Sequence, residues 1–346
     1  MNAPRYPRKP RPGERVAVLS PSSGLPGALP LPFELGLRRL REFGLEPVEY
    51  ATTRLMGASP QDRAADLHKA FADPTISAVI ASIGGDDQIT LLPYLDANLI
   101  GANPKPFFGY SDNTVLLAYL WQRGIVGYYG GSVMSHFGRP GAMHPLTAES
   151  LQAALFGGGE YELQPAKAFT DVDRPWSEEA TFEAEPELRP ADDWIWHNAH
   201  REVTGVSWGG TLDVLSWLLM ADQAVSPADA YADGVLFIET SEELPSARTV
   251  YRSLRSMGER GLLGRFAAVL VGRPKAWSFE RRTTPKERVA FSADQHEAVL
   301  RALQEYAPEA TVVQNVDLGH TDPHLVIPYG GLIRVDGPAR RIHVTY

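Results

Sequence analysis

Short apolar segments alternate with amphipathic segments through the first half of the chain. Three apolar runs, rich in β-branched or aromatic residues, predict strands at 15–20, 76–83 and 105–110. Amphipathic segments with helical spacing predict helices at 32–43, 88–95 and 114–122. Strands that alternate with helices are joined by right-handed crossovers. The first half therefore predicts an α/β domain built on a doubly wound parallel sheet.

The second half is richer in predicted strands, at 202–207, 234–239, 267–272, 311–317, 332–335 and 341–346. Helices are expected between them at 212–220, 246–257 and 292–306. Residues 160–200 are rich in Glu, Asp and Pro and indicate a linker with a long loop. We expect an N-terminal domain over 1–165, a linker and substrate loop over 166–200, and a smaller, β-rich α+β domain over 201–346.

Composition narrows the function classes. The 346 residues suggest two domains, and 33 Lys and Arg against 42 Asp and Glu give a net charge of -9. An acidic surface disfavours nucleic-acid binding. The chain has no Cys, which excludes disulfides and thiol nucleophiles and suits a reducing cytosol. No apolar run is long enough for a membrane span. The basic, Pro-rich residues 1–13 lack a signal-peptide core, so we expect a loose tail and a cytoplasmic protein.

Polar or glycine-rich turns follow each of the first three predicted strands, where ligands bind in such sheets. The sharpest lies in Phe107–Thr114, where a strand runs directly into a helix with Ser111 at the corner. Such an elbow exposes a nucleophilic hydroxyl at a helix N-terminus. The alternative is that Ser111 or Asp112 only caps the helix. Because Asn113 stands where the usual elbow has Gly, a standard α/β-hydrolase fits poorly.

A serine nucleophile needs a base and an orienting acid. His320 follows a predicted strand between Gly319 and a proline-containing loop, and His324 is its rival. Glu239 ends an apolar strand, and two further acids compete with it, Glu242 and Glu243. Each of these side chains could also be an ordinary solvated loop residue.

Three further features could line a cleft. Gly84 and Gly85, followed by Asp86, would let the backbone approach a ligand or donate to an oxyanion, unless they only form a turn. Gly209 and Gly210 would line the same cleft or cap a helix. Indoles at i and i+2 share a face of an extended chain. Trp194 and Trp196 could therefore form a stacking platform for a flat ligand group, or they could pack in the core.

Several of these motifs together resemble the S66 serine peptidases, which comprise the LD-carboxypeptidases and the microcin C immunity proteins. The segments that carry the resemblance are VAVLSPSSG, SIGGDD, FGYSDNT, GGTLDVLSWL, LFIETSEE and GHTDPHLVIPYGG, in the family's order. By motif, Ser111 resembles the nucleophile, Glu239 the triad acid and His320 the base. The resemblance also implies oxyanion donors at the backbone N–H groups of Gly85 and Asp112.

The resemblance implies a class I amidotransferase-like N-terminal domain, a β-rich C-terminal domain, a cytoplasmic homodimer, and no metal or other cofactor. The turn at Gly84–Asp87, the sequence after Glu239 and the two-Trp loop look like the microcin C immunity branch. That branch cleaves aminoacyl- or peptidyl-nucleotides. The alternatives are an LD-carboxypeptidase acting on murein tetrapeptide, a non-catalytic small-molecule binding protein, and a phosphotransferase that would need Mg²⁺ and ATP.

Overall fold

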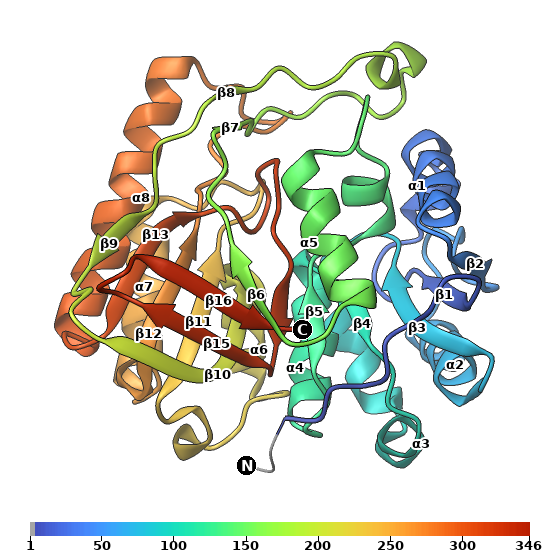
Figure 1. Cartoon of the computed structure of the whole chain (residues 1–346), viewed down its shortest axis with the longest axis horizontal. Helices are drawn as coiled ribbons and strands as arrows, with labels where there is room; N and C mark the ends of the chain where they lie inside the picture. Colours follow the sequence, from blue (N-terminus) through green and yellow to red (C-terminus); the bar gives the residue numbers. More distant parts are fainter. Residues whose placement is uncertain (1–3) are drawn as a thin grey trace.

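The computed structural model describes residues 4–346, which form two sheets flanked by helices (Figure 1). The N-terminal sheet has the strand order β14-β5-β4-β3-β1-β2. Its five parallel strands are β1 (Arg15–Leu19), β2 (Glu46–Glu49), β3 (Ile76–Ala81), β4 (Phe107–Gly109) and β5 (Gly127–Tyr129). This order reverses between β1 and β3, and ligand clefts form beyond the strand ends at such a reversal.

Five helices belong to this half: α1 (Pro30–Glu42), α2 (Pro60–Ala72), α3 (Ala97–Ala102), α4 (Thr114–Trp121) and α5 (Pro145–Phe156). All eight residues of α4 are buried, because this helix packs against β10 and α6 of the second half as well as against its own sheet. The uniformly apolar sequence of α4 follows from this burial on every side.

The second sheet has the order β6-β16-β15-β10-β11-β12-β13-β9. Its parallel centre consists of β10 (Glu202–Thr211), β11 (Gly234–Glu239), β12 (Phe266–Gly272) and β13 (Thr311–Val316). The remaining strands pair antiparallel: β6 (Glu160–Leu163), β9 (Ile195–His197), β15 (Leu332–Asp336) and β16 (Arg341–Thr345). Its helices are α6 (Leu212–Ala221), α7 (Ala247–Glu259) and α8 (Pro285–Tyr306). The structure thus confirms an α/β fold with a parallel N-terminal sheet and a separate β-rich C-terminal domain.

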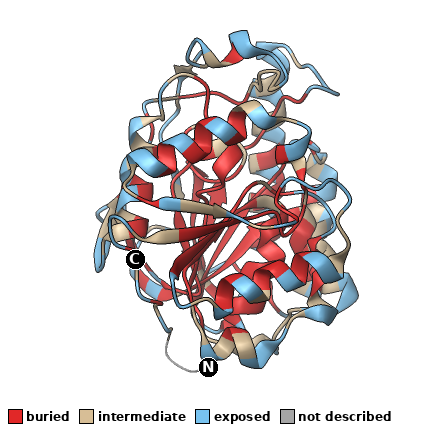
Figure 2. Ribbon diagram, turned by 90° about the vertical axis from the view of Figure 1, so that its right-hand side faces the viewer, coloured by how far each residue is buried: buried red, intermediate tan, exposed pale blue. Residues whose placement is uncertain are grey.

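The two halves share elements. The short strand β14 (Ile327–Tyr329) comes from the second half but pairs with β5 at the edge of the first sheet. Residues between β6 and β9 form a long excursion that holds the two-stranded pair β7 (Ala168–Phe169) and β8 (Arg189–Pro190) and a short 3-10 helix (Glu179–Phe182), at the top of Figure 1. Figure 2 shows the inner strands of the sheets buried and the outward faces of the helices exposed. In residues 4–346, no helix combines the length and apolarity that crossing a membrane requires.

One expectation from the sequence is wrong, and another is refined. Residues 4–13 are not a loose tail: Arg5 bridges to Ile125, the Tyr6 hydroxyl accepts from Leu332 N at 2.8 Å, and Lys9 lies over the Tyr128 ring. Residues 1–3 lie outside the described part. The helix predicted at 88–95 is present as a 3-10 helix (Gln88–Tyr94) that contains Pro93. The helix α2 and the strand β2 were not predicted.

Candidate active site

Ser111 sits on a strained turn between β4 and α4. Its φ angle is 62°, a left-handed conformation that costs free energy in a residue other than glycine and that clusters at functional sites. The Thr114 hydroxyl at the start of α4 donates to the carbonyl oxygen of Ser111 at 2.7 Å and holds the turn. The side chain of Ser111 lines a pocket. This is the elbow geometry expected from the sequence.

The loop Gly84–Gly85 lies directly against this elbow. A Cβ atom on Gly84 would come 2.9 Å from the Cβ of Ser111 and 3.4 Å from the backbone nitrogen of Asp112. A Cβ on Gly85 would collide with the Ser22 hydroxyl at 2.2 Å. Only glycine therefore allows this close approach, which brings the backbone of both loops around Ser111.

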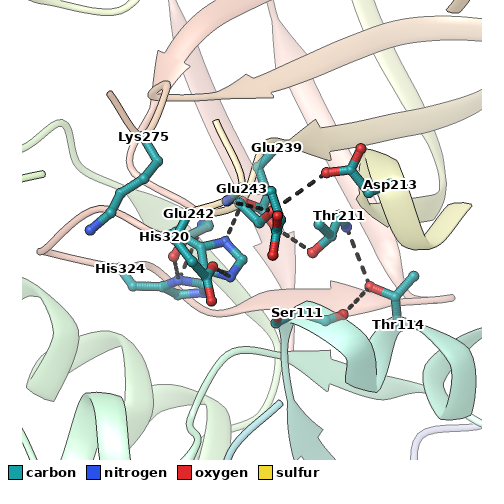
Figure 3. A network of polar contacts seen from close by, with 12 residues as sticks. Ser111, Thr114, Thr211, Asp213, Glu239, Glu242, Glu243, Lys275, His320 and His324 are labelled. Atoms are coloured by element: carbon teal, nitrogen blue, oxygen red, sulfur yellow. Dashed lines mark hydrogen bonds and ion pairs between the residues drawn. The ribbon is translucent and has the colours of Figure 1, made fainter. Parts of the chain in front are cut away.

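Glu239 and His320 lie close together because both are at the carboxyl ends of strands in one parallel sheet. Glu239 is the last residue of β11, and His320 follows β13, with β12 between the two strands. The Nδ1 atom of His320 lies 2.7 Å from Oε2 of Glu239 (Figure 3). Gly319 makes this contact possible: its φ is 95°, and a Cβ there would lie 2.5 Å from Oε2 of Glu239.

The carboxylate of Glu239 is buried and held by two further hydroxyl groups. Its Oε1 accepts from the Tyr129 hydroxyl at 2.6 Å and from Thr211. Burial alone would raise the pKa of Glu239, but the charge of His320 and these hydrogen bonds hold the pKa below its usual value. Glu239 is therefore an anion in direct contact with the His320 ring.

Tyr129 was not found from the sequence. Its hydroxyl accepts from the backbone nitrogen of Ser111 at 3.4 Å while it donates to Glu239, so it joins the elbow to the carboxylate. It lies at the end of β5, a strand too short to be recognised from periodicity. Thr211 was noted only as part of a glycine-rich turn.

Glu242 contacts the other nitrogen of His320, with Oε2 3.2 Å from Nε2. Burial lowers the pKa of His320, but the charges of Glu239 and Glu242 outweigh burial and raise it to about 9. Within residues 4–346, no hydrogen bond joins the Ser111 hydroxyl to His320; catalytic hydrogen bonds often form only once substrate is bound. His324, the rival base, directs Nδ1 to the carbonyl oxygen of Gly319 at 2.7 Å instead.

The pocket in front of these residues has a volume of about 380 Å³. Ser111, His320 and Glu242 line it, together with Gly84 and Gly85. Its wall also carries two aromatic side chains, the half-buried Trp176 and the exposed Phe279. Two ion pairs border it: Arg139 with Asp322 at 2.7 Å, and Lys275 with Asp173 at 2.5 Å. A pocket of this kind suits a small ligand with both polar and flat apolar parts.

The structure corrects the expected substrate contacts outside this pocket. Trp194 is 7% exposed and donates from Nε1 to Asp317 at 3.0 Å, so its indole is part of the core. Trp196 lies in β9, which pairs with β13, and does not line the pocket. The aromatic wall comes from Trp176 in the preceding excursion. The sequence of the acidic segment 160–200 alone did not show which of its indoles packs into the core.

Gly209, Gly210 and Asp86 also lie outside the lining. A Cβ on Gly209 would lie 1.7 Å from the carbonyl oxygen of Phe237, and one on Gly210 would lie 2.4 Å from the Thr114 hydroxyl. Both glycines therefore allow close packing of β10 rather than ligand contact. Asp86 is exposed, and its neighbour Asp87 pairs with Arg63 at 2.8 Å. In the described part of the chain, no group of three or more His, Asp or Glu is arranged to hold a metal ion.

Comparison with known families agrees with this geometry. Residues 16–130 match the LD-carboxypeptidase N-terminal domain, and residues 204–335 match the LD-carboxypeptidase C-terminal domain. The chain is thus an enzyme of the serine carboxypeptidase class. It belongs to the S66 peptidase family, as its motifs suggested.

Similar proteins with names include carboxypeptidases and a microcin self-immunity protein. A putative carboxypeptidase of Vibrio cholerae is 26% identical over 327 residues, 92% of this chain and 91% of the relative. The microcin C7 self-immunity protein MccF of Escherichia coli is 26% identical over 288 residues, 82% of this chain and 78% of the relative. The murein tetrapeptide carboxypeptidase of Pseudomonas aeruginosa is 35% identical over 122 residues, 34% of this chain and 38% of the relative.

Solved structures share the whole fold. MccF in complex with aspartyl sulfamoyl adenosine superposes with a TM-score of 0.84 at 24% identity and covers 99% of both chains. An MccF-like protein from Streptococcus pneumoniae in complex with AMP gives a TM-score of 0.84 at 24% identity, over 96% of this chain and 99% of the other.

Proposed function

We propose that this enzyme is a serine hydrolase that cleaves the bond between an aminoacyl or peptidyl group and a nucleotide moiety. The observation that carries the proposal is the arrangement in one pocket of the Ser111 elbow, the His320–Glu239 pair and an indole from Trp176. MccF and an MccF-like protein have been solved in complex with aspartyl sulfamoyl adenosine and with AMP, which supports a nucleotide-bearing substrate.

In the proposed mechanism, His320 takes the proton of Ser111 as its oxygen attacks the substrate carbonyl. Glu239 keeps the imidazole oriented and stabilises the cation that forms. Backbone N–H groups of Gly85 and Asp112 receive the developing oxyanion, each such donor typically contributing ~3 kcal/mol to transition-state stabilisation. His320 then protonates the leaving group, and water hydrolyses the acyl-enzyme.

A second candidate substrate is a murein tetrapeptide. It is favoured by the 35% identity to the murein tetrapeptide carboxypeptidase, which covers 34% of this chain. The chemistry at Ser111 would be the same, and the two substrates differ in the group that leaves: a D-amino acid from the murein peptide and a nucleotide-like group from the other. A flat leaving group would use the aromatic wall of the pocket, and a D-amino acid would not.

The proposal is tested with a fluorophosphonate label and two hydrolysis assays. We expect the label to modify wild-type enzyme and not Ser111→Ala, and we expect the variant to lose hydrolysis by a factor of about 10⁴ or more. The variant should keep its thermal unfolding temperature, since the change removes only a hydroxyl. Faster hydrolysis of an aminoacyl sulfamoyl adenosine than of murein tetrapeptide supports the proposed substrate, and the reverse favours the second candidate. Wild-type activity in Ser111→Ala would overturn the mechanism.

A further inference from the structure

Glu242 stands at a position from which it can control the catalytic base. It lies in the turn after β11, its side chain is 56% exposed, and it lines the pocket beside His320. Its carboxylate lies 3.2 Å from Nε2 of His320, while Glu239 holds Nδ1 at 2.7 Å (Figure 3). Both nitrogens of the ring are thus engaged by carboxylates. Nε2 is the atom that has to receive the proton of Ser111.

Two other cations of the pocket are paired with carboxylates, and Arg174 donates to the backbone carbonyl oxygens of Ala184 and Ala180. Lys275 pairs with Asp173 at 2.5 Å, and Arg139 pairs with Asp322 at 2.7 Å. Within residues 4–346, His320 is the cation that Glu242 contacts. A carboxylate at the mouth of a pocket with this single partner favours a ligand that brings a positive charge of its own.

The position of that charge follows from covalent geometry. In an amino acid, the α-nitrogen lies about 2.5 Å from the carbonyl carbon, as set by the N–Cα and Cα–C bonds and the angle between them. When Ser111 attacks that carbon, a free α-ammonium group therefore lies beside the reacting carbon, in the pocket that His320 and Glu242 also line. An acylated α-nitrogen carries no charge, so it does not compete with Nε2 of His320 for the carboxylate of Glu242.

We propose that Glu242 binds the free α-ammonium group of an aminoacyl substrate and thereby releases Nε2 of His320 to accept the proton of Ser111. This inference rests on the proposed function and selects its aminoacyl form over its peptidyl form. Murein tetrapeptide, whose reacting residue has an acylated α-nitrogen, is excluded as a good substrate by the same argument. Glu242 would thus set which substrates activate the base.

The experiment compares alanyl sulfamoyl adenosine with its N-acetyl derivative, in which an added acetyl group removes the charge of the α-nitrogen. We expect wild-type enzyme to prefer the free amine by about tenfold to a hundredfold in kcat/KM, the range of a charge-assisted hydrogen bond. Glu242→Gln should lose most of this preference, because a neutral amide does not attract the ammonium. Hydrolysis of the N-acetyl substrate should be maintained or increased, since Nε2 is no longer held by a carboxylate.

Glu243→Gln is the matched control, because Glu243 is also exposed, is one residue away and does not line the pocket. It should keep the preference of the wild type. Equal rates on the two substrates in the wild type, or an unchanged preference in Glu242→Gln, would overturn the role of Glu242 and leave the proposed function intact. If the wild type hydrolyses neither substrate, the proposed function fails and this inference fails with it.

Discussion

The Nδ1 atom of His320 lies 2.7 Å from Oε2 of Glu239, although 81 residues separate the two in the chain. The distance is fixed by the parallel sheet, in which the carboxyl ends of β11 and β13 lie at one edge on either side of β12. Tyr129 and Thr211 hold the carboxylate from the other side. The pair is therefore preorganised before any substrate enters, which is what an orienting acid requires.

Replacing Glu239 by Gln should reduce kcat by about 10⁴, because the amide neither fixes the tautomer of His320 nor stabilises its cation. The protein should remain folded, since Gln keeps the shape of the side chain. Glu243→Gln serves as the control and should retain wild-type kcat. Steady-state kinetics of both variants decides the assignment: a large loss at Glu243 with none at Glu239 would reverse it.

Gly319→Ala tests whether close approach of the backbone sets the geometry of the pair. The added Cβ would lie 2.5 Å from Oε2 of Glu239, so either the loop or the carboxylate has to move. Misplacement of a catalytic group by 1 Å can cost about a hundredfold in rate, and we expect kcat to fall by at least that factor.

The control for this variant is Gly261→Ala. Gly261 has a φ of 74°, close to the 95° of Gly319, but a Cβ there meets nothing within 4 Å. Both variants should lose stability from backbone strain, and only Gly319→Ala should lose kcat. Equal kcat in the two variants at a temperature where both are folded would show that the contact between Gly319 and Glu239 is unimportant.

Sequence reasoning predicted the strand–turn–helix at Ser111 because each part has a local signal. An apolar strand, a polar turn and a helix start follow one another within a few residues. Glu239 was also recognisable, since a carboxylate after an apolar strand marks a sheet edge. These predictions depended on local pattern alone, and β11 begins and ends where the pattern indicated.

The contacts that required tertiary information were not predictable. Trp194 and Trp176 both lie in acidic, Pro-rich sequence, and only the tertiary structure shows that Trp194 is buried and bonded to Asp317. Tyr129 reaches Glu239 from the other half of the molecule, across 110 residues of sequence. Packing of the two halves against each other, rather than propensity, selects these side chains.

The activity should increase with pH. Although burial opposes it, the charges of Glu239 and Glu242 raise the pKa of His320 to about 9 from 6.5. The free enzyme therefore holds His320 protonated at neutral pH, and only the neutral form accepts the proton of Ser111. We expect log kcat/KM for N-acetyl alanyl sulfamoyl adenosine, whose α-nitrogen does not titrate, to rise with a slope of about one up to this pKa and then to level off.

The groups that face His320 are Glu239, Glu242, Asp173, Asp213, Lys275, Tyr110, His136 and His324. Burial holds the pKa of His136 and of His324 below the usual value, so these two rings stay neutral across the rising limb. Glu242→Gln removes one of the two charges that raise the pKa of His320, so the limb should move to lower pH. A wild-type limb centred at or below pH 6.5 would contradict this account.

Trp176, rather than Trp194 or Trp196, should select substrates that carry a flat aromatic group. Its half-buried indole lines the pocket that contains Ser111, whereas Trp194 is 7% exposed and bonded to Asp317. Stacking of a base on an aromatic ring contributes roughly 1–3 kcal/mol, so Trp176→Ala should raise KM for alanyl sulfamoyl adenosine by about tenfold to a hundredfold with little change in kcat. Trp196→Ala, which removes a half-buried indole outside the pocket, is the control and should leave KM unchanged. Trp194→Ala should instead lower the free energy of unfolding by about 3–5 kcal/mol, as expected for loss of a core indole.

The measurement is KM and kcat for all three variants, each checked for its unfolding temperature, on the aminoacyl nucleoside and on a murein tetrapeptide. Because the peptide has no ring to stack, Trp176→Ala should change its KM far less, and equal losses on the two substrates would mean that Trp176 only supports the shape of the pocket.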